Sequence, residues 1–151
     1  MARVRKERGN EARRKLKVLF IAGFGPIVRD PESSGKLYAD TLGIPFEEEP
    51  GGYLHTGKLD GAKQFALWPL TQAAESCFGS GTWPNDAPIP QAWIEFDVED
   101  LQEATNELKK QGYRLLVAAR KEPWGQTVTR LLSPEGLLVG VTHTPWLRAK
   151  E

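Results

Sequence analysis

Tryptophans and carboxylates are the side chains in this sequence that could build a ligand site. Residues 91–98 alternate apolar and polar types as a half-buried strand does, so Trp93, Glu95 and Asp97 share one face. Indole faces bind planar or cationic groups, and a neighbouring carboxylate could be the charge partner. A buried carboxylate needs a partner, so either this face is wet or Arg130 pairs with it. The other side chains that strand alternation and the hairpin pattern add to this surface are Gln64, Ala66, Trp68, Trp124 and Gln126.

The remaining reactive residues form no catalytic or metal-binding pattern. The chain has one cysteine, Cys77, and two histidines, His55 and His143, which lie far apart in the sequence. Cys77 has no disulfide partner and is interpreted as a small buried hydrophobe. A lone histidine is more often a structural hydrogen-bonding residue than a ligand, so neither histidine is assigned a function.

Positive and negative charges balance over the whole chain but not along it. The sequence has 20 basic and 20 acidic residues, and its first 17 residues hold eight Lys or Arg and two Glu. We expect residues 1–16 to form a disordered, solvated tail, because they lack the aromatic residues that nucleic-acid-binding segments interleave. No apolar run reaches the roughly 18 residues of a membrane span, and no secretory signal is visible. These features favour a cytoplasmic protein without membrane or nucleic-acid partners.

The order of strands and helices repeats once along the chain. Asp30 begins one predicted helix and Gly43 ends it, while Asp100 begins the other and Gly112 ends it. Each helix follows one strand and precedes three, so the chain consists of two βαβββ units. The predicted strands cover residues 17–29, 46–49, 52–59 and 62–68 in the first unit, and 91–98, 113–118, 126–132 and 137–142 in the second. The predicted buried stripes are Leu37, Tyr38, Thr41 and Leu42 on the first helix, and Leu101, Ala104, Thr105 and Leu108 on the second.

Two such units predict an α+β fold in which the sheets join side by side. The helices then cover the outer faces, and the inner faces form a concave trough that carries the tryptophans. The linker between the units contains one short helical stretch, residues 71–77, and could cover the trough or form a patch between subunits. We delimit a domain at 17–146, with modules 17–69 and 91–146, a linker at 70–90 and a tail at 147–151.

These motifs resemble the vicinal oxygen chelate superfamily, which includes glyoxalase I, extradiol dioxygenases and the bleomycin-resistance and fosfomycin-resistance proteins. The resemblance is carried by VRDPESSGKLYADTLG, WIEFDVEDLQEA and PWGQTVTRLLSPEGLLVGV, where Ser133 replaces the Asp of the family's final turn. It implies two tandem βαβββ modules that form a concave mixed sheet. It also implies a homodimer, because members commonly pair. It does not imply one activity, because the family hosts many chemistries.

Enzymes of this superfamily usually hold a divalent metal ion in the trough. The resemblance places the four ligand positions at Gly23, Ala66, Trp93 and Gly140, and none of these can donate a side-chain oxygen or an imidazole nitrogen. We therefore expect no metal ion and no other cofactor. The small residues among the four would leave space for a ligand.

Three functions remain open at this point. The favoured one is metal-independent binding of an aromatic or drug-like small molecule, similar in logic to the bleomycin-resistance proteins. The second is a glyoxalase- or lyase-like enzyme with a non-standard or absent metal site, in which Glu95 would be the general base. The third is a non-catalytic interaction domain whose trough is filled by side chains. The residues expected to bind the ligand are Gln64, Trp68, Trp93, Glu95, Trp124 and Gln126.

Overall fold

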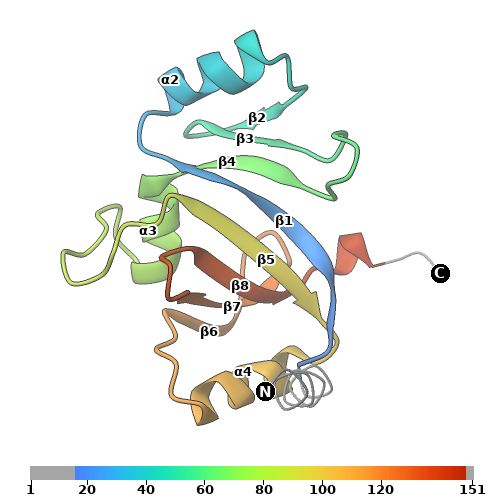
Figure 1. Cartoon of the computed structure of the whole chain (residues 1–151), viewed down its shortest axis with the longest axis vertical. Helices are drawn as coiled ribbons and strands as arrows, with labels where there is room; N and C mark the ends of the chain where they lie inside the picture. Colours follow the sequence, from blue (N-terminus) through green and yellow to red (C-terminus); the bar gives the residue numbers. More distant parts are fainter. Residues whose placement is uncertain (1–15, 149–151) are drawn as a thin grey trace, which may run out of the picture.

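The computed structural model describes residues 16–148 and shows one strongly curved sheet with helices on both of its faces (Figure 1). Its eight strands lie in the order β2-β3-β4-β1-β5-β8-β7-β6. The tail expected at 1–16 lies outside the described residues except for Leu16, as does the tail at 147–151 beyond Arg148. The strands are β1 (Val18–Val28), β2 (Glu47–Glu49), β3 (Tyr53–Thr56), β4 (Phe65–Pro69), β5 (Ala92–Val98), β6 (Val117–Lys121), β7 (Thr127–Leu132) and β8 (Leu138–His143).

The two predicted βαβββ units are present and their sheets join edge to edge. In each unit the first strand pairs in parallel with the fourth, β1 with β4 and β5 with β8. The units meet where β1 and β5 pair antiparallel, with Gly23 opposite Glu95. The helix starts also repeat, because Asp30 accepts a hydrogen bond from the backbone N of Ser33 and Asp100 accepts one from Glu103. The α+β fold predicted from the sequence is therefore confirmed.

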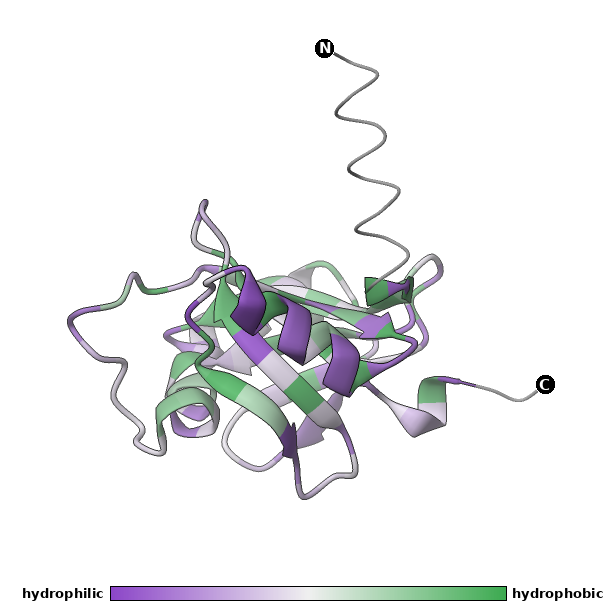
Figure 2. Cartoon of the chain, turned by 90° about the horizontal axis from the view of Figure 1, so that it is seen from below, coloured by the Kyte–Doolittle hydropathy of each residue, from purple (hydrophilic) through white to green (hydrophobic). Residues whose placement is uncertain are grey.

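Helix α4 (Leu101–Lys110) covers the outer face of the second unit as predicted. Leu101, Ala104 and Thr105 are buried, and the first two pack with Val98 and Val141. The opposite side of the helix is hydrophilic (Figure 2). The buried side of this helix is therefore the one that the 3.6-residue period of the sequence predicts.

The helix of the first unit departs from its predicted buried stripe. It begins as α2 (Pro31–Gly35) and continues as the π-helical segment η1 (Lys36–Thr41). Leu37 and Leu42 are 50% and 59% exposed, whereas the half-buried Tyr38 lies near Phe65 of β4. A π-helical turn holds more residues than an α-helical one, so a pattern counted at 3.6 residues per turn goes out of phase.

The strand predicted at residues 113–118 lies four residues further along, as β6. Tyr113 still caps the end of α4, since its backbone N donates to the carbonyl of Leu108 at 3.2 Å. Pairing with β7 starts only at Leu116, whose N donates to the carbonyl of Arg130 at 2.8 Å. The prediction was wrong because it started the strand directly after Gly112.

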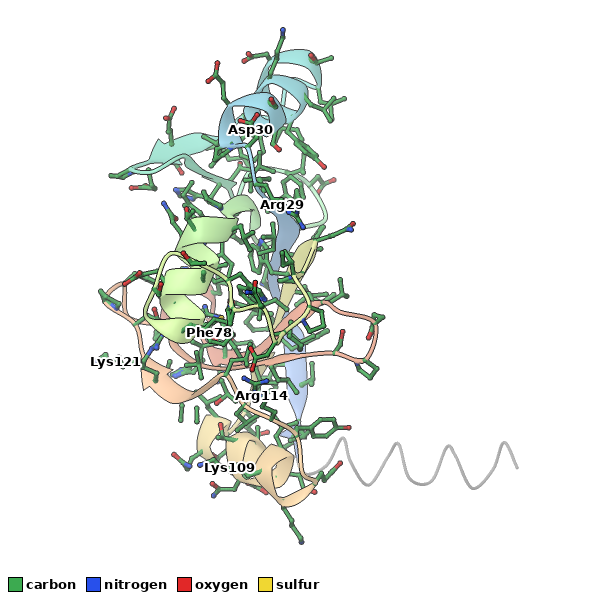
Figure 3. The ribbon with its side chains drawn as sticks, turned by 90° about the vertical axis from the view of Figure 1, so that its left-hand side faces the viewer. Arg29, Asp30, Phe78, Lys109, Arg114 and Lys121 are labelled. Carbon is green, nitrogen blue, oxygen red and sulfur yellow. The ribbon has the colours of Figure 1, made fainter. Side chains whose placement is uncertain are left out.

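Helix α3 (Leu70–Phe78) occupies the concave side of the sheet, which agrees with the first of the two alternatives for the linker, a cover of the trough or a patch between subunits. Figure 3 shows it between the two arms of the curved sheet, with Phe78 at its end. Its residues Ala73, Ala74 and Cys77 are buried in the main core cluster together with two tryptophans, Trp68 and Trp93. Burial raises the pKa of the Cys77 thiol to about 11, consistent with a packing role. No helix among the described residues is long and apolar enough to cross a membrane.

A buried aspartate ties the end of the chain to the sheet. Asp97 is fully buried and accepts hydrogen bonds from the backbone N of Thr144 at 2.9 Å, from the hydroxyl of Thr144 and from Nε of Arg148 at 2.6 Å. These bonds position the short 3-10 helix η2 (Pro145–Leu147) that lies between the two partners. Asp97 is therefore an anchor for η2, and the expectation that it could be a ligand's charge partner was wrong.

Replacing Asp97 by Ala is expected to lower the free energy of unfolding by about 3 kcal/mol, because a buried cluster of donors loses its acceptor. Urea denaturation followed by circular dichroism measures the change. Asp86→Ala is the matched control, since the Asp86 side chain is 72% exposed and lies 3.9 Å from Arg114. The control should change stability by less than about 0.5 kcal/mol. Equal losses in the two variants would contradict the anchoring role.

Candidate functional site

The concave face of the sheet is filled at one end and open at the other. The open end is a cavity of about 540 Å³. Its walls come from β1 to β5, α3, β7 with the loop before it, and η2. The structure brings all six predicted ligand-binding residues to this cavity: Gln64, Trp68, Trp93, Glu95, Trp124 and Gln126.

Trp68 and Trp93 form the boundary between the core and the cavity. Their rings pack edge to face with centroids 6.0 Å apart, and both also pack in the core cluster that contains α3. The indole N of Trp93 donates to the carbonyl of Ala66 at 3.1 Å, which fixes the plane of the ring. At the rim, Trp124 and Trp146 remain 53% and 52% exposed. The trough is thus filled by side chains at one end and open at the other.

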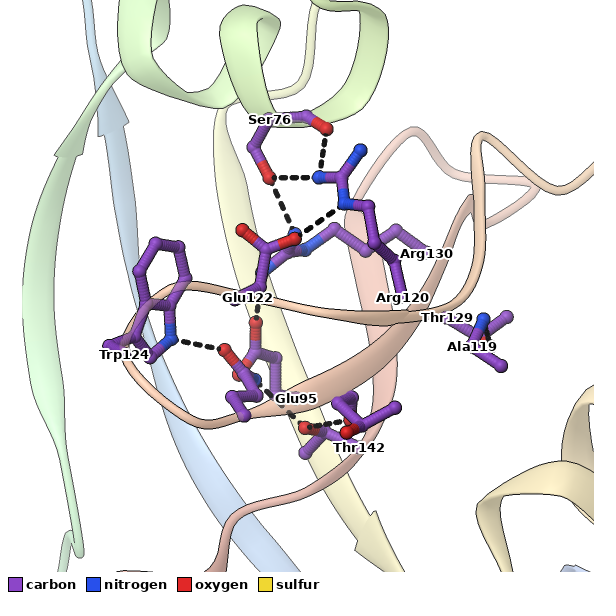
Figure 4. A network of polar contacts seen from close by, with 11 residues as sticks. Ser76, Glu95, Ala119, Arg120, Glu122, Trp124, Thr129, Arg130 and Thr142 are labelled. Carbon is purple, nitrogen blue, oxygen red and sulfur yellow. Dashed lines mark hydrogen bonds and ion pairs between the residues drawn. The ribbon is translucent and has the colours of Figure 1, made fainter.

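Glu95 lies on the cavity floor with both carboxylate oxygens engaged (Figure 4). One oxygen accepts from Nε2 of Gln126 at 2.7 Å, and the other accepts from the guanidinium of Arg130 at 3.1 Å. Gln126 is itself held from both sides, because its oxygen accepts from the indole N of Trp124 at 2.8 Å and its nitrogen also donates to Thr142 at 2.8 Å. Both bonds hold the carboxylate in place between β5, Gln126 and Arg130, which favours a structural role for Glu95 over that of a base.

The ion pair extends away from the cavity into a larger charge network (Figure 4). Arg130 donates to the hydroxyl of Ser76 on α3 at 2.7 Å and lies 4.0 Å from Glu122. Glu122 in turn pairs with Arg120 at 2.7 Å. The guanidinium of Arg130 also stacks 5.0 Å from the ring centroid of Trp68. Two carboxylates and two guanidiniums therefore neutralise one another beneath the cavity.

The four positions where the family resemblance would place metal ligands do not form a metal site. A Cβ atom on Gly23 would lie 2.9 Å from the Trp93 ring, and one on Gly140 would lie 2.9 Å from Cγ of Glu95. Ala66 and Trp93 supply no donor oxygen or imidazole. No group of three or more His, Cys, Asp and Glu within residues 16–148 could hold a metal ion. Gly140 makes room for Glu95, and Gly23 makes room for the ring of Trp93 while also lining the cavity.

A second polar group on the cavity wall, centred on His55, was not predicted from the sequence. Nε2 of His55 lies 3.1 Å from Oε2 of Glu49, and Nδ1 of His55 lies 3.4 Å from Nε2 of Gln64. The ring of His55 stacks on that of Tyr53 at a centroid distance of 5.3 Å. Pairing the two predicted strands would have placed His55 on the inner face, because β3 sets His55 opposite Ala66, a position already assigned to that face.

The hydroxyl of Tyr53 remains protonated in this setting. Burial raises the pKa of Tyr53 to about 12, and the negative charge of Glu95 acts in the same direction. A hydrogen bond with Gln64 and the positive charge of Arg130 oppose the rise. Tyr53 therefore offers a hydrogen-bond donor to the cavity throughout the neutral pH range.

Replacing Gly140 by Ala is expected to lower the free energy of unfolding by about 1–3 kcal/mol, because the new methyl group would push Glu95 away from Arg130 and Gln126. Thermal and urea denaturation measure the loss. Gly81→Ala is the matched control, because no atom lies within 4 Å of a Cβ built at Gly81. A Gly140→Ala protein as stable as the control would show that Glu95 has another position with equal energy.

Comparisons with known proteins agree with this architecture. The sequence model of the Glyoxalase/Bleomycin resistance protein/Dioxygenase superfamily matches residues 21–141. A superfamily member from Vibrio splendidus 12B01 superposes with a TM-score of 0.53 at 17% identity, covering 80% of this chain and 96% of the other. Methylmalonyl-CoA epimerase from Mycobacterium tuberculosis superposes with a TM-score of 0.52 at 20% identity, covering 86% and 91%.

The corresponding epimerase from Streptomyces coelicolor, a single-residue variant in complex with 2-nitronate-propionyl-CoA, gives a TM-score of 0.52 at 17% identity, covering 88% and 99%. At these identities the likeness concerns the fold. A comparison of the sequence with curated proteins finds no match. The family-model match, the two βαβββ units and the joined eight-stranded sheet lead to one conclusion: the chain belongs to the glyoxalase/bleomycin resistance protein/dioxygenase superfamily.

Proposed function

We propose that this protein binds an aromatic small molecule in the cavity without the help of a metal ion. The observation that carries the proposal is a cavity of about 540 Å³ with tryptophan walls, at the place where the family's metal ligands would stand. Small-molecule sites typically measure about 300–1,000 Å³ and are mostly apolar with a few polar groups. Sequestering a drug, as the resemblance to bleomycin-resistance proteins implies, is one form of this function.

The exposed tryptophans at the rim support binding over a purely structural role. Trp124 and Trp146 are large apolar side chains that stand half in solvent beside the cavity. Trp124 is held in place by its hydrogen bond to Gln126. An aromatic ring that is already fixed loses little conformational entropy when a planar ligand stacks on it. A filled interaction domain would not need such a rim.

A glyoxalase- or epimerase-like reaction has less support. Metal chemistry of the family's usual kind needs donor side chains that Gly23, Ala66, Trp93 and Gly140 do not provide. The carboxylate that could replace the metal as a base, Glu95, is neutralised by Arg130. One tightly bound metal ion per chain in purified protein would reverse this preference.

Removal of a rim tryptophan tests the proposal. Aromatic compounds are screened by quenching of tryptophan fluorescence, and the affinity of each hit is measured by calorimetry. Trp124→Ala should weaken binding at least about fivefold, as the loss of about 1 kcal/mol of aromatic contact predicts. Tyr113→Ala is the matched control, because Tyr113 is also exposed, at 47%, but does not line the cavity. If no aromatic compound binds at millimolar concentration to the folded protein, the proposal fails.

We also propose that the chain forms the homodimer that the family resemblance implies, and that the second copy packs on β1. Ile21 and Phe24 are 48% and 39% exposed although β1 is a central strand of the sheet. Apolar side chains gathered in this way commonly mark an interface. Light scattering should report a dimer, and Ile21→Lys should convert it to a monomer. Leu42→Lys, at a position that is 59% exposed on the outer helix, should leave the dimer intact. A monomeric unmodified protein would contradict the proposal.

A further inference from the structure

Most hydrogen-bonding groups on the cavity wall are already used within the protein. Both oxygens of Glu95 and both ends of the Gln126 amide have partners. The indole N of Trp93 donates to a backbone carbonyl, and Nε2 of Gln72 donates to the carbonyl of Pro50 at 3.0 Å. A ligand would gain little by competing for the N–H groups of Trp93 and Gln126, because each new bond would break an existing one, while the oxygens of Glu95 are already paired with Gln126 and Arg130 but keep a further lone pair each.

His55 adds to the wall an acceptor that has no strong partner. A carboxylate can only accept, so the contact with Glu49 requires the proton of a neutral imidazole to be on Nε2. The lone pair is then on Nδ1, which faces the Gln64 amide at 3.4 Å. That separation is beyond the range of about 2.7–3.2 Å in which N–H···O and related bonds are strong. Nδ1 of His55 is therefore an acceptor that a better donor can use.

Donors surround this acceptor. Gln64 lines the cavity with its amide 3.4 Å from Nδ1, and Tyr53 stacks against the imidazole with its hydroxyl protonated. One side of the cavity thus presents an acceptor together with two donors. The opposite floor, around Glu95 and Arg130, presents groups that are already satisfied.

We infer that the ligand is a phenol, whose hydroxyl donates to Nδ1 of His55 and accepts from the side chain of Gln64 or Tyr53. A hydroxyl can donate and accept at once, which matches this mixed set of groups. A carboxylate ligand has no proton to give to Nδ1 and would face the negative charge of Glu49. An ammonium ligand cannot accept from Gln64 or Tyr53. The inference rests on the proposed function and specifies its ligand class.

In this arrangement His55 determines specificity and Glu49 is a positioning residue. Glu49 holds the imidazole in the tautomer that exposes the lone pair of Nδ1 to the cavity. Its side chain is 55% exposed, so it acts through this one bond and not through burial. A site that hydrogen-bonds a hydroxyl discriminates strongly against an analogue that lacks it, because the protein group is left unpaired.

A phenol and its methyl ether test the inference. The affinities of 2-naphthol and 2-methoxynaphthalene for the full-length protein are compared by calorimetry at neutral pH. The ether can still accept but cannot donate, so the protein should bind 2-naphthol at least about tenfold more tightly, the effect of leaving one buried polar group unpaired. His55→Phe should remove this preference by weakening 2-naphthol alone. Glu49→Gln should reduce it, because the tautomer is no longer fixed.

His143→Phe is the matched control, because His143 lies exposed at the end of β8 and does not line the cavity. It should keep the full preference. Equal affinity of the unmodified protein for the two compounds overturns the inference but leaves aromatic binding standing. A preference that survives in His55→Phe also overturns it. If neither compound binds, the proposed aromatic binding itself is refuted.

Discussion

The ion pair between Glu95 and Arg130 is the interaction on which the cavity depends. It joins β5 to β7, and through the hydroxyl of Ser76 it also ties α3 to the inner face of the sheet. A buried ion pair adds little net stability, because desolvation offsets most of the attraction. Its effect here is geometric, since it holds Gln126, and through it Trp124, at one place on the rim. The pair therefore defines the shape of the open end of the trough.

The same pair accounts for the residues that stand where the family's metal ligands are expected. Glu95 lies beside Gly140 in the sheet, and its side chain fills the space that a longer residue at position 140 would need. Trp93 does the same for Gly23. A glutamate side chain at position 140 and the Glu95–Arg130 pair could not occupy this volume together. The side chains at these positions pair with one another and donate nothing to a metal ion, and this leaves aromatic surface as the main feature of the site.

The sequence predicted the fold well because the fold depends on local patterns. The N-caps Asp30 and Asp100, the strand alternation of residues 91–98 and the final turn at Ser133–Gly136 are each readable over a few residues. The inner-face residues followed from strand parity. One error arose because the helical period changes: a π-helical segment shifted the buried stripe around Leu37. Another arose because distant residues decide the role of a side chain: Asp97 is held by Thr144 and Arg148, about 50 residues away.

His55 shows why a site is harder to predict than a fold. A lone histidine has no motif, and its partner Glu49 precedes it across a turn that carries two glycines with positive φ, Gly51 and Gly52. Only the pairing of β2 with β3 brings Glu49 and His55 onto the same patch of sheet. Because the charges beneath the cavity cancel, attraction of a charged ligand cannot set its selectivity. If the protein binds an aromatic ligand as we propose, selectivity comes from aromatic shape and from hydrogen-bonding atoms without a strong partner, such as Nδ1 of His55.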